Sequence, residues 1–230
     1  MHFVLLPGMD GTGELFGPFI EALPEESKVT IVRYPTEEVQ GLEGLVRVVE
    51  ASVPGNEPYC IVAESFSGPV AIQFASKHPK RLRAMVLCAT FCSNPLAKGL
   101  RWVGQLAHPK FFQPTLPRLV VRRYFVSDTS SNELVESVRS AVKMVAPEVL
   151  ASRAKLMLSV DVATELKQIK TPVLCLTGGK DRIVGKRGKA QVEIALPGAQ
   201  FETLEGPHLL LQCLPKQSVE AILGFLNEGR

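Results

Sequence analysis

Short apolar segments alternate with longer segments of helical periodicity, and this alternation limits the possible folds more than any other feature of the chain. Segments rich in apolar or β-branched residues and bounded by Gly or Pro predict strands at residues 3–6, 29–33, 59–63, 84–88, 172–177 and 200–204. Helical spacing follows at 42–53, 66–78, 183–196 and 215–227. We therefore predict an α/β fold, a mostly parallel sheet of about six strands with helices on both faces.

One interval breaks this pattern. Between Asn94 and Lys170 there is no good strand, but there are several amphipathic helical segments, of which 131–145 is the clearest. A chain of 230 residues fits one domain, and it contains no repeats and no linker. The expected organisation is a single domain, 1–230, with a core formed by 1–93 and 166–230 and a helical cap over 94–165.

The composition is that of an ordinary globular protein, with 46% hydrophobic and 21% charged residues. A net charge of +3 is too small to indicate a nucleic-acid partner. No apolar run approaches the roughly 18–20 residues that a membrane span needs. The first residues lack the basic, apolar and cleavage regions of a signal peptide, so a cytoplasmic protein is expected.

The cysteines and histidines give no metal-binding pattern. An odd number of cysteines without metal-type spacing predicts reduced structural thiols, with a C-x-x-x-C redox pair at positions 88 and 92 as a weak alternative. No two histidines are four residues apart. We expect neither a metal nor a cofactor. The cysteines are Cys60, Cys88, Cys92, Cys175 and Cys213.

The strongest chemical signal is a serine between a strand and a helix. The strand 59–63 leads directly to Ser65, whose neighbours Ala63, Ser67 and Gly68 are small. A nucleophile on a sharp strand-to-helix turn needs small neighbours, and the following helix N-terminus favours negative charge there. The alternative is that Ser65 only caps the helix. The adjacent Glu64 either supports the site through a hydrogen bond, tunes a histidine, or is an inert charge.

A serine hydroxyl needs a base, usually a histidine oriented by a carboxylate. His208 follows the last strand, whereas the other histidines lie before the first strand, at the far end of the helix after the serine, and within the 94–165 interval. Asp181 follows the penultimate strand in a Gly-Gly turn. All three groups are therefore expected at the carboxyl edge of a parallel sheet, where such sheets form their sites.

In this order of serine, aspartate and histidine, the chain resembles the α/β-hydrolase superfamily over nearly its whole length. The segment LPGMDGTG (6–13), together with Glu64-Ser65-Phe66, is similar to the branch of esterases, thioesterases and lipid acyltransferases that includes plant phytyl ester synthases. The resemblance implies Ser65 as nucleophile, Asp181 as acid and His208 as base. The two leading antiparallel strands usual in that superfamily are expected to be absent or cut short.

The first loop has a role in this picture. A tetrahedral intermediate needs two N–H donors, one from Phe66 after the nucleophile and one from the loop after the first strand. The resemblance implies Met9 as the second donor, with Asp10 and Thr12 bracing the loop. A competing interpretation takes the glycines at 11, 13 and 17, with Arg33, as a dinucleotide site. Four residues separate the strand from the first of these glycines, which disfavours that interpretation.

The expected activity is hydrolysis of carboxylic esters with small-to-medium acyl chains, without a cofactor. The alternatives are a thioesterase or acyltransferase that acts on acyl-CoA, acyl carrier protein or lipid, and a non-catalytic ligand-binding protein. The aromatic residues of the cap either line an acyl pocket or seal a small core of their own. They are Trp102, Phe111, Phe112, Tyr124 and Phe125.

The cap region is basic. Residues 94–160 contain ten Lys or Arg against four Asp or Glu. Arg118 and Arg122, four residues apart, would share a helical face, with Arg123 about 100° away. These basic residues either form an ordinary solvated face or attract an acidic partner, such as acyl carrier protein, acyl-CoA or an anionic lipid surface. The sequence leaves the oligomeric state open.

Overall fold

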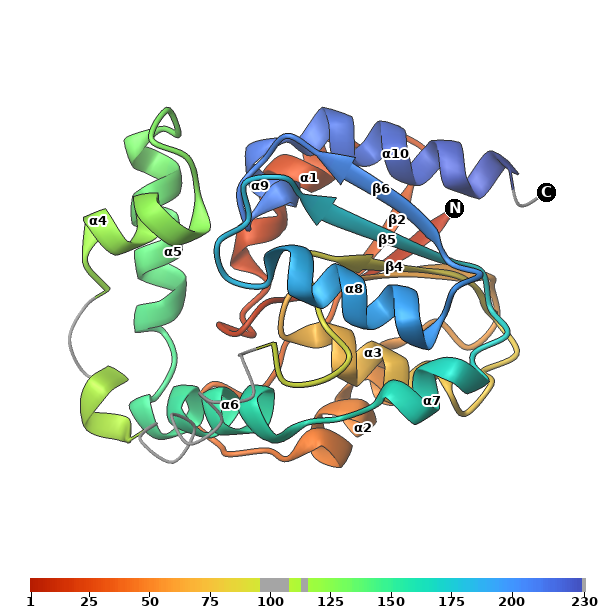
Figure 1. Cartoon of the computed structure of the whole chain (residues 1–230), viewed down its shortest axis with the longest axis horizontal. Helices are drawn as coiled ribbons and strands as arrows, with labels where there is room; N and C mark the ends of the chain where they lie inside the picture. Colours follow the sequence, from red (N-terminus) through yellow and green to blue (C-terminus); the bar gives the residue numbers. More distant parts are fainter. Residues whose placement is uncertain (96–107, 113–115, 229–230) are drawn as a thin grey trace.

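A computed structural model of the chain describes residues 1–95, 108–112 and 116–228. Its six described strands form one sheet in the order β2-β1-β3-β4-β5-β6, and every neighbouring pair is parallel (Figure 1). The predicted α/β fold is confirmed, and each predicted strand is present within two residues. The strands are β1 (His2–Leu6), β2 (Lys28–Ile31), β3 (Tyr59–Glu64), β4 (Leu82–Cys88), β5 (Val173–Gly178) and β6 (Gln200–Leu204).

Helices cover both faces of the sheet. One face carries α2 (Leu42–Ser52), α3 (Ser67–Ala75), α7 (Ala163–Gln168) and α8 (Gly185–Ala195), and the other carries α1 (Gly17–Ala22), α9 (Leu210–Cys213) and α10 (Pro215–Glu228) (Figure 1). The remaining helical elements are η1 (Glu14–Phe16), η3 (Pro109–Phe112), α4 (Arg118–Val120), η4 (Val121–Phe125), α5 (Asn132–Lys143) and α6 (Pro147–Ser159).

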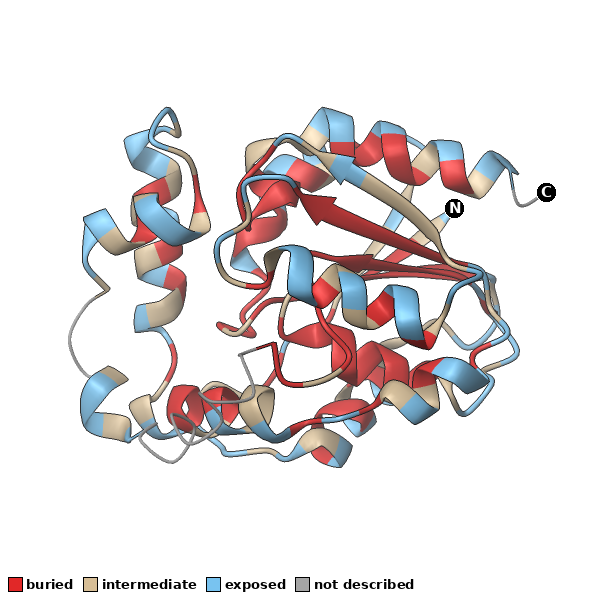
Figure 2. Ribbon diagram, in the orientation of Figure 1, coloured by how far each residue is buried: buried red, intermediate tan, exposed pale blue. Residues whose placement is uncertain are grey.

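The four central strands, β1, β3, β4 and β5, are buried on both sides, as expected for a parallel sheet with two helical layers, whereas the edge strands β2 and β6 are partly exposed (Figure 2). Successive residues alternate between two hydrophobic clusters. In β1, Val4 and Leu6 belong to the cluster under α2 and α3, and Phe3 and Leu5 to the cluster under α10. The central strands therefore read as continuous apolar runs, which is why the sequence locates them so well.

The strand order reverses direction at the centre of the sheet. From β1 the chain moves outward to β2, and then returns to place β3 on the opposite side of β1. In open parallel sheets, a ligand site forms outside the carboxyl ends of the strands at such a switch point. Here that position lies between the loop after β1 and the turn after β3, which are the two segments that the sequence singles out.

The interval between β4 and β5 is helical where the structure describes it. α4 and α5 lie beyond the carboxyl ends of β5 and β6 (Figure 1). Val121, Val126 and Val135 from this interval form a cluster with Leu15 and Leu209 of the remaining chain. The division into a core and a helical cap stays a prediction.

Close packing of α8 against the chain after β4 yields a test of the fold. A Cβ on Gly188 would lie 2.5 Å from the carbonyl oxygen of Thr90 and 2.1 Å from Val184 Cγ1. We expect Gly188→Ala to lower the free energy of unfolding by about 1–3 kcal/mol, because the helix must shift away from the backbone. Gly224→Ala on α10 is the matched control. Its Cβ would meet nothing within 4 Å, so it should be neutral or stabilising by about 0.5–1 kcal/mol. Urea unfolding measures both, and equal effects would contradict the packing.

Candidate active site

Ser65 occupies a strained turn between β3 and α3. Its φ of 50° lies in the left-handed region, which a residue with a side chain rarely adopts. Two contacts from the adjacent strand and the residues after it hold this conformation. The Ser65 amide donates to the Cys88 carbonyl at 2.9 Å, and the Thr90 hydroxyl donates to the Ser65 carbonyl. The turn predicted from the sequence is present.

The neighbours of Ser65 must be small, as expected, because little space surrounds the turn. A Cβ on Gly68 would lie 2.0 Å from Thr90 Oγ1, the hydroxyl that holds the Ser65 carbonyl. Ala63 and Ser67 are fully buried. A larger side chain at Gly68 would push away the group that fixes the turn.

The structure brings the three predicted side chains together. His208 Nε2 lies 2.8 Å from Ser65 Oγ, and His208 Nδ1 lies 2.9 Å from Asp181 Oδ2. His208 comes from the loop after β6, and Asp181 comes from the turn after β5. The side chains of His208 and Asp181 are each only 2% exposed.

Asp181 is held so that one oxygen faces the histidine. Its Oδ1 accepts the amides of Ile183 and Val184 at 2.8 and 3.1 Å, which leaves Oδ2 for His208. Burial tends to raise the pKa of Asp181, but the hydrogen bond and charge of His208, with these two amides, bring it below its ordinary value. The carboxylate is therefore ionised at neutral pH and can stabilise a protonated imidazole.

The loop after β1 lies against the start of α3. The Ser67 hydroxyl donates to the Pro7 carbonyl and is also 2.8 Å from the Tyr34 hydroxyl. As expected, Asp10 braces the loop, since its Oδ2 accepts the Thr12 amide at 2.9 Å and the Thr12 hydroxyl at 2.5 Å.

Met9 and Phe66, the two residues expected to form an oxyanion hole, both have unused amides. Within the described part of the chain, neither the Met9 N–H nor the Phe66 N–H donates a hydrogen bond. Two free donors beside a serine suit a developing negative charge. Arg33, which the competing interpretation assigns to a dinucleotide, has partners within the protein. It pairs with Glu14 at 3.2 Å and donates to the Thr12 carbonyl.

Sequence reasoning missed Arg153, which it counted as part of the basic cap. The structure buries this side chain to 2% exposure and directs its guanidinium at the loop after β1. A signal was available. Apolar residues lie three or four positions from Arg153 on the same helix, namely Val149, Leu150 and Met157. Helical periodicity therefore places Arg153 on the apolar face of α6.

Glu64 accepts a hydrogen bond from Gln212, and among the described residues it forms no hydrogen bond or ion pair with His208. Gln212 Nε2 donates to its Oε2 at 3.3 Å. The pKa of Glu64 is raised to about 8, because burial and, to a smaller extent, the charge of Asp10 raise it more than the Gln212 hydrogen bond lowers it. Glu64 is therefore neutral at pH 7. Glu64 Oε1 and Gln212 Oε1 are buried and have no hydrogen-bond partner among the described residues.

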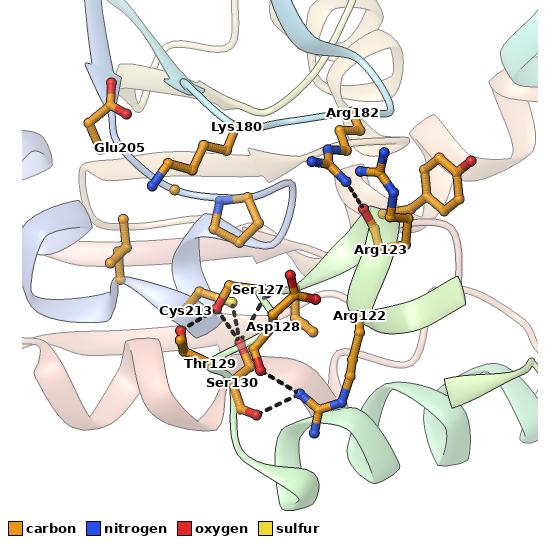
Figure 3. A pocket seen from close by; sticks show the side chains of 15 residues that line it. Arg122, Arg123, Ser127, Asp128, Thr129, Ser130, Lys180, Arg182, Glu205 and Cys213 are labelled. Atoms are coloured by element: carbon orange, nitrogen blue, oxygen red, sulfur yellow. Dashed lines mark hydrogen bonds between the residues drawn. The ribbon is translucent and has the colours of Figure 1, made fainter. Parts of the chain in front are cut away.

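A pocket of about 500 Å³ lies next to the histidine loop, between that loop, the turn around Asp181 and the segment 122–130 (Figure 3). Its lining includes Gly206 and Pro207, which precede His208. Its cationic side chains are Arg122, Arg123, Lys180 and Arg182, and its acidic ones are Asp128 and Glu205. Within the described chain, none of these four cations forms an ion pair with a carboxylate.

Arg118 and Arg122, for which a shared helical face is expected, both reach α5. Arg118 pairs with Glu136 at 2.7 Å, and Arg122 donates to Asn132 Oδ1 at 2.8 Å, one turn earlier on that helix. The backbone passes here from α4 into the wider π-helical turn η4. Arg122 also donates to the carbonyls of Asp128 and Ser130 (Figure 3).

The described aromatic residues of the interval lie in different environments, and an acyl pocket formed by them stays a prediction. Phe111 is 73% exposed and Tyr124 is 46% exposed. Phe112 packs into a small cluster within the interval, and Phe125 packs into the cluster that also contains Leu15 and Leu209. Phe125 also lies edge-on to His208, with ring centroids 6.2 Å apart. Trp102 lies outside the described residues.

The cysteines are all free, and four of the five are buried. Burial raises the pKa of Cys92 to about 11 and that of Cys88 well above its ordinary value, so these thiols are protonated at neutral pH. Among the described residues no group of three or more His, Cys, Asp or Glu side chains could hold a metal ion. Likewise, no helix in the described ranges is long and apolar enough to cross a membrane.

Comparisons with known proteins identify the family and the fold. The family described as serine aminopeptidase, S33, matches residues 31–209. A pimeloyl-[acyl-carrier protein] methyl ester esterase from Aeromonas hydrophila is 26% identical over 97% of this chain and 94% of its own length. A chloroplastic phytyl ester synthase from Arabidopsis thaliana is 35% identical, but only over 40% of this chain and 14% of its own length.

The fold is also found among solved structures. The structure of a hydrolase from Oleispira antarctica superposes with a TM-score of 0.82 at 15% identity, covering 98% of this chain and 90% of that one. The α/β-hydrolase resemblance is thereby confirmed.

The raised pKa of Glu64 predicts how stability depends on pH. The unfolded chain releases this proton near pH 4.5 and the folded chain only near 8, so folding stability falls as pH rises between these values. Replacing Glu64 by Gln removes the titration. The stability difference between variant and wild type should therefore shift in favour of the variant by about 1.4 kcal/mol per pH unit within this window. Urea unfolding from pH 5 to 9 measures it, and parallel pH profiles would show that Glu64 ionises normally.

Proposed function

The chain belongs to the hydrolase family described as serine aminopeptidase, S33, and from this membership we propose that it is a serine hydrolase that cleaves carboxylic esters. The observation that carries the proposal is the chain of hydrogen bonds from Ser65 through His208 to Asp181, at 2.8 and 2.9 Å. The family description names a peptidase, but the relative that aligns with nearly the whole chain is named as an ester hydrolase.

In the proposed reaction, Ser65 Oγ attacks the ester carbonyl while His208 Nε2 takes the hydroxyl proton. Asp181 holds Nδ1 and stabilises the imidazolium. The amides of Met9 and Phe66 donate to the oxyanion of the tetrahedral intermediate. The C–O bond to the leaving alcohol then breaks, and His208 returns the proton to that alcohol. Water, deprotonated by His208, releases the acid from Ser65 by the same steps.

The helix after Ser65 and the neutral Glu64 both favour this chemistry. α3 begins at Ser67, so its free N–H groups and dipole favour negative charge at the serine. Because Glu64 is protonated at neutral pH, it adds no negative charge beside the oxyanion. A carboxylate in that position would oppose the charge that develops in the transition state.

Acyl transfer to an alcohol is the second candidate. It differs only in the group that deacylates Ser65, and the partial similarity to a phytyl ester synthase supports it. Product analysis with and without added alcohol distinguishes the two, because transfer yields a new ester in place of the free acid.

Substitution of the serine tests the proposal. Ser65→Ala should abolish both the turnover of short p-nitrophenyl esters and covalent labelling by a fluorophosphonate, and His208→Gln should lower kcat by at least about 10³-fold. Ser76→Ala and His108→Gln are the matched controls, since Ser76 ends α3 and His108 is exposed. Full activity of Ser65→Ala would exclude the mechanism. A wild type that binds esters without labelling or turnover would favour a ligand-binding protein.

We propose further that the ester is presented on acyl carrier protein. Two curated relatives are named for such a substrate. The lining of the basic pocket includes the direct sequence neighbours of both Asp181 and His208. The cations that serve this role differ from the set expected from sequence. Arg153 is buried and Arg118 is paired, whereas Lys180 and Arg182 join from outside the cap interval.

Charge reversal at the pocket tests the carrier. Arg123→Glu/Arg182→Glu should lower kcat/KM by about tenfold or more on a methyl ester carried by acyl carrier protein, and leave a neutral p-nitrophenyl ester unchanged. High salt should erase the loss, because the Debye length is about 8 Å at physiological ionic strength and shorter above it. Lys143→Glu/Lys155→Glu carries the same charge change on exposed residues away from the pocket. Equal losses on both substrates, or in the control, would contradict a carrier site.

A further inference from the structure

We infer that Arg153 is a positioning residue that holds the loop after β1 in the conformation that stabilises the oxyanion. Arg153 lies on α6, whereas the loop lies 143 residues earlier in the chain. The inference rests on the proposed function, and it assigns a specific task to a side chain that sequence reasoning placed on the surface.

The guanidinium of Arg153 donates three hydrogen bonds to backbone carbonyls. Its Nη1 donates to the carbonyls of Met9 at 2.9 Å and Asp10 at 2.7 Å. Its Nη2 donates to the carbonyl of Pro35 at 2.8 Å. Only the fork of an arginine presents several donors in fixed directions to acceptors on two segments at once.

These bonds fix the turn that carries the proposed donor. The Gly11 amide donates to the Gly8 carbonyl at 3.0 Å, so Met9 and Asp10 are the central residues of a turn. Peptide units are planar, so holding the two central carbonyls fixes both peptide planes that follow Met9. The Met9 N–H belongs to the peptide plane before Met9. Once the following planes are fixed, the direction of this N–H can change only by rotation about the bonds to the Cα of Met9.

Gly11 explains why the guanidinium can approach so closely. It has a φ of 71°, and a Cβ at this position would lie 2.5 Å from Arg153 Nη1. The Gly11 carbonyl accepts the Tyr34 amide at 2.8 Å. The first glycine of the DGTG segment, Gly11, therefore leaves the space that the guanidinium of Arg153 occupies.

The energetics point to a role in the site. Within the described chain Arg153 has no ion pair, so a buried cation is retained without a carboxylate partner. Its compensation is the three carbonyls, the attraction of Asp10, and the face of the Tyr34 ring 5.8 Å away. A buried cation is costly as a purely structural element, since apolar packing of similar volume is often equally stable. Its positive charge beside the loop also favours an oxyanion.

The test compares Arg153→Met with Leu150→Ala. Leu150 is buried one turn earlier on α6 and packs with Val145 and Val149, so its variant loosens the helix without touching the loop. Lys155→Met, exposed on the same helix, controls for the loss of charge. Arg153→Lys keeps the charge but loses the fork, and it is the second variant should Arg153→Met not fold.

Arg153→Met should lower kcat on a p-nitrophenyl ester by about 10- to 100-fold while KM stays within about twofold. A trifluoromethyl ketone, which forms a tetrahedral oxyanion on serine, should lose affinity by a similar factor. Arg153→Lys should recover part of the loss. Leu150→Ala and Lys155→Met should retain kcat, although Leu150→Ala lowers Tm.

Hydrogen exchange gives a readout that does not need activity. In Arg153→Met and Arg153→Lys, the amides of Gly11 and Tyr34 should exchange faster than in wild type, and in Leu150→Ala they should not. Unchanged kcat or unchanged exchange in these variants would overturn the inference, as would an equal kcat loss in Leu150→Ala. Failure of the proposed function is distinguishable, because then the wild type itself would show no turnover and no labelling.

Discussion

The turn at Ser65 is the constraint on which the rest of the site depends. A serine at a φ of 50° is strained, so its conformation must be imposed by its surroundings. The carbonyl of Cys88 and the hydroxyl of Thr90 impose it from β4 and the residues just after it. This contact requires Gly68 to lack a side chain, and it leaves the amide of Phe66 free. The position of β4 beside β3 thus stabilises both the sheet and the turn at Ser65.

The fold and the three central side chains could be predicted because they follow from local patterns. A parallel sheet with two helical layers leaves continuous apolar strands, and each strand end shows directly which residue reaches the carboxyl edge. Ser65, Asp181 and His208 each follow such an end. Their meeting requires only that the strands lie side by side in the right order, which the family resemblance supplied.

The features that were not predicted depend on contacts between distant segments. Arg153 reads as one more basic residue until α6 is placed against the loop after β1. Arg118 and Arg122 look equivalent in sequence, but Arg118 pairs with a carboxylate whereas Arg122 donates to backbone carbonyls of the nearby loop. The basic pocket joins arginines of the cap interval to Lys180 and Arg182 beside Asp181 (Figure 3). Counting charges along the chain cannot reveal a group of this kind, because its members come from separate segments.

The distance in sequence between Arg153 and the loop it holds has a consequence during synthesis. The chain leaves the ribosome with its N-terminus first, so β1, β3 and Ser65 emerge long before α6, and His208 emerges later still. Long-range contacts of this kind close only after the intervening chain has been made. Until these segments have emerged, the nascent protein carries Ser65 without its hydrogen-bond partner His208, and the loop after β1 without the contacts from Arg153. A product that ends before β6 would therefore lack the contact between Ser65 and His208.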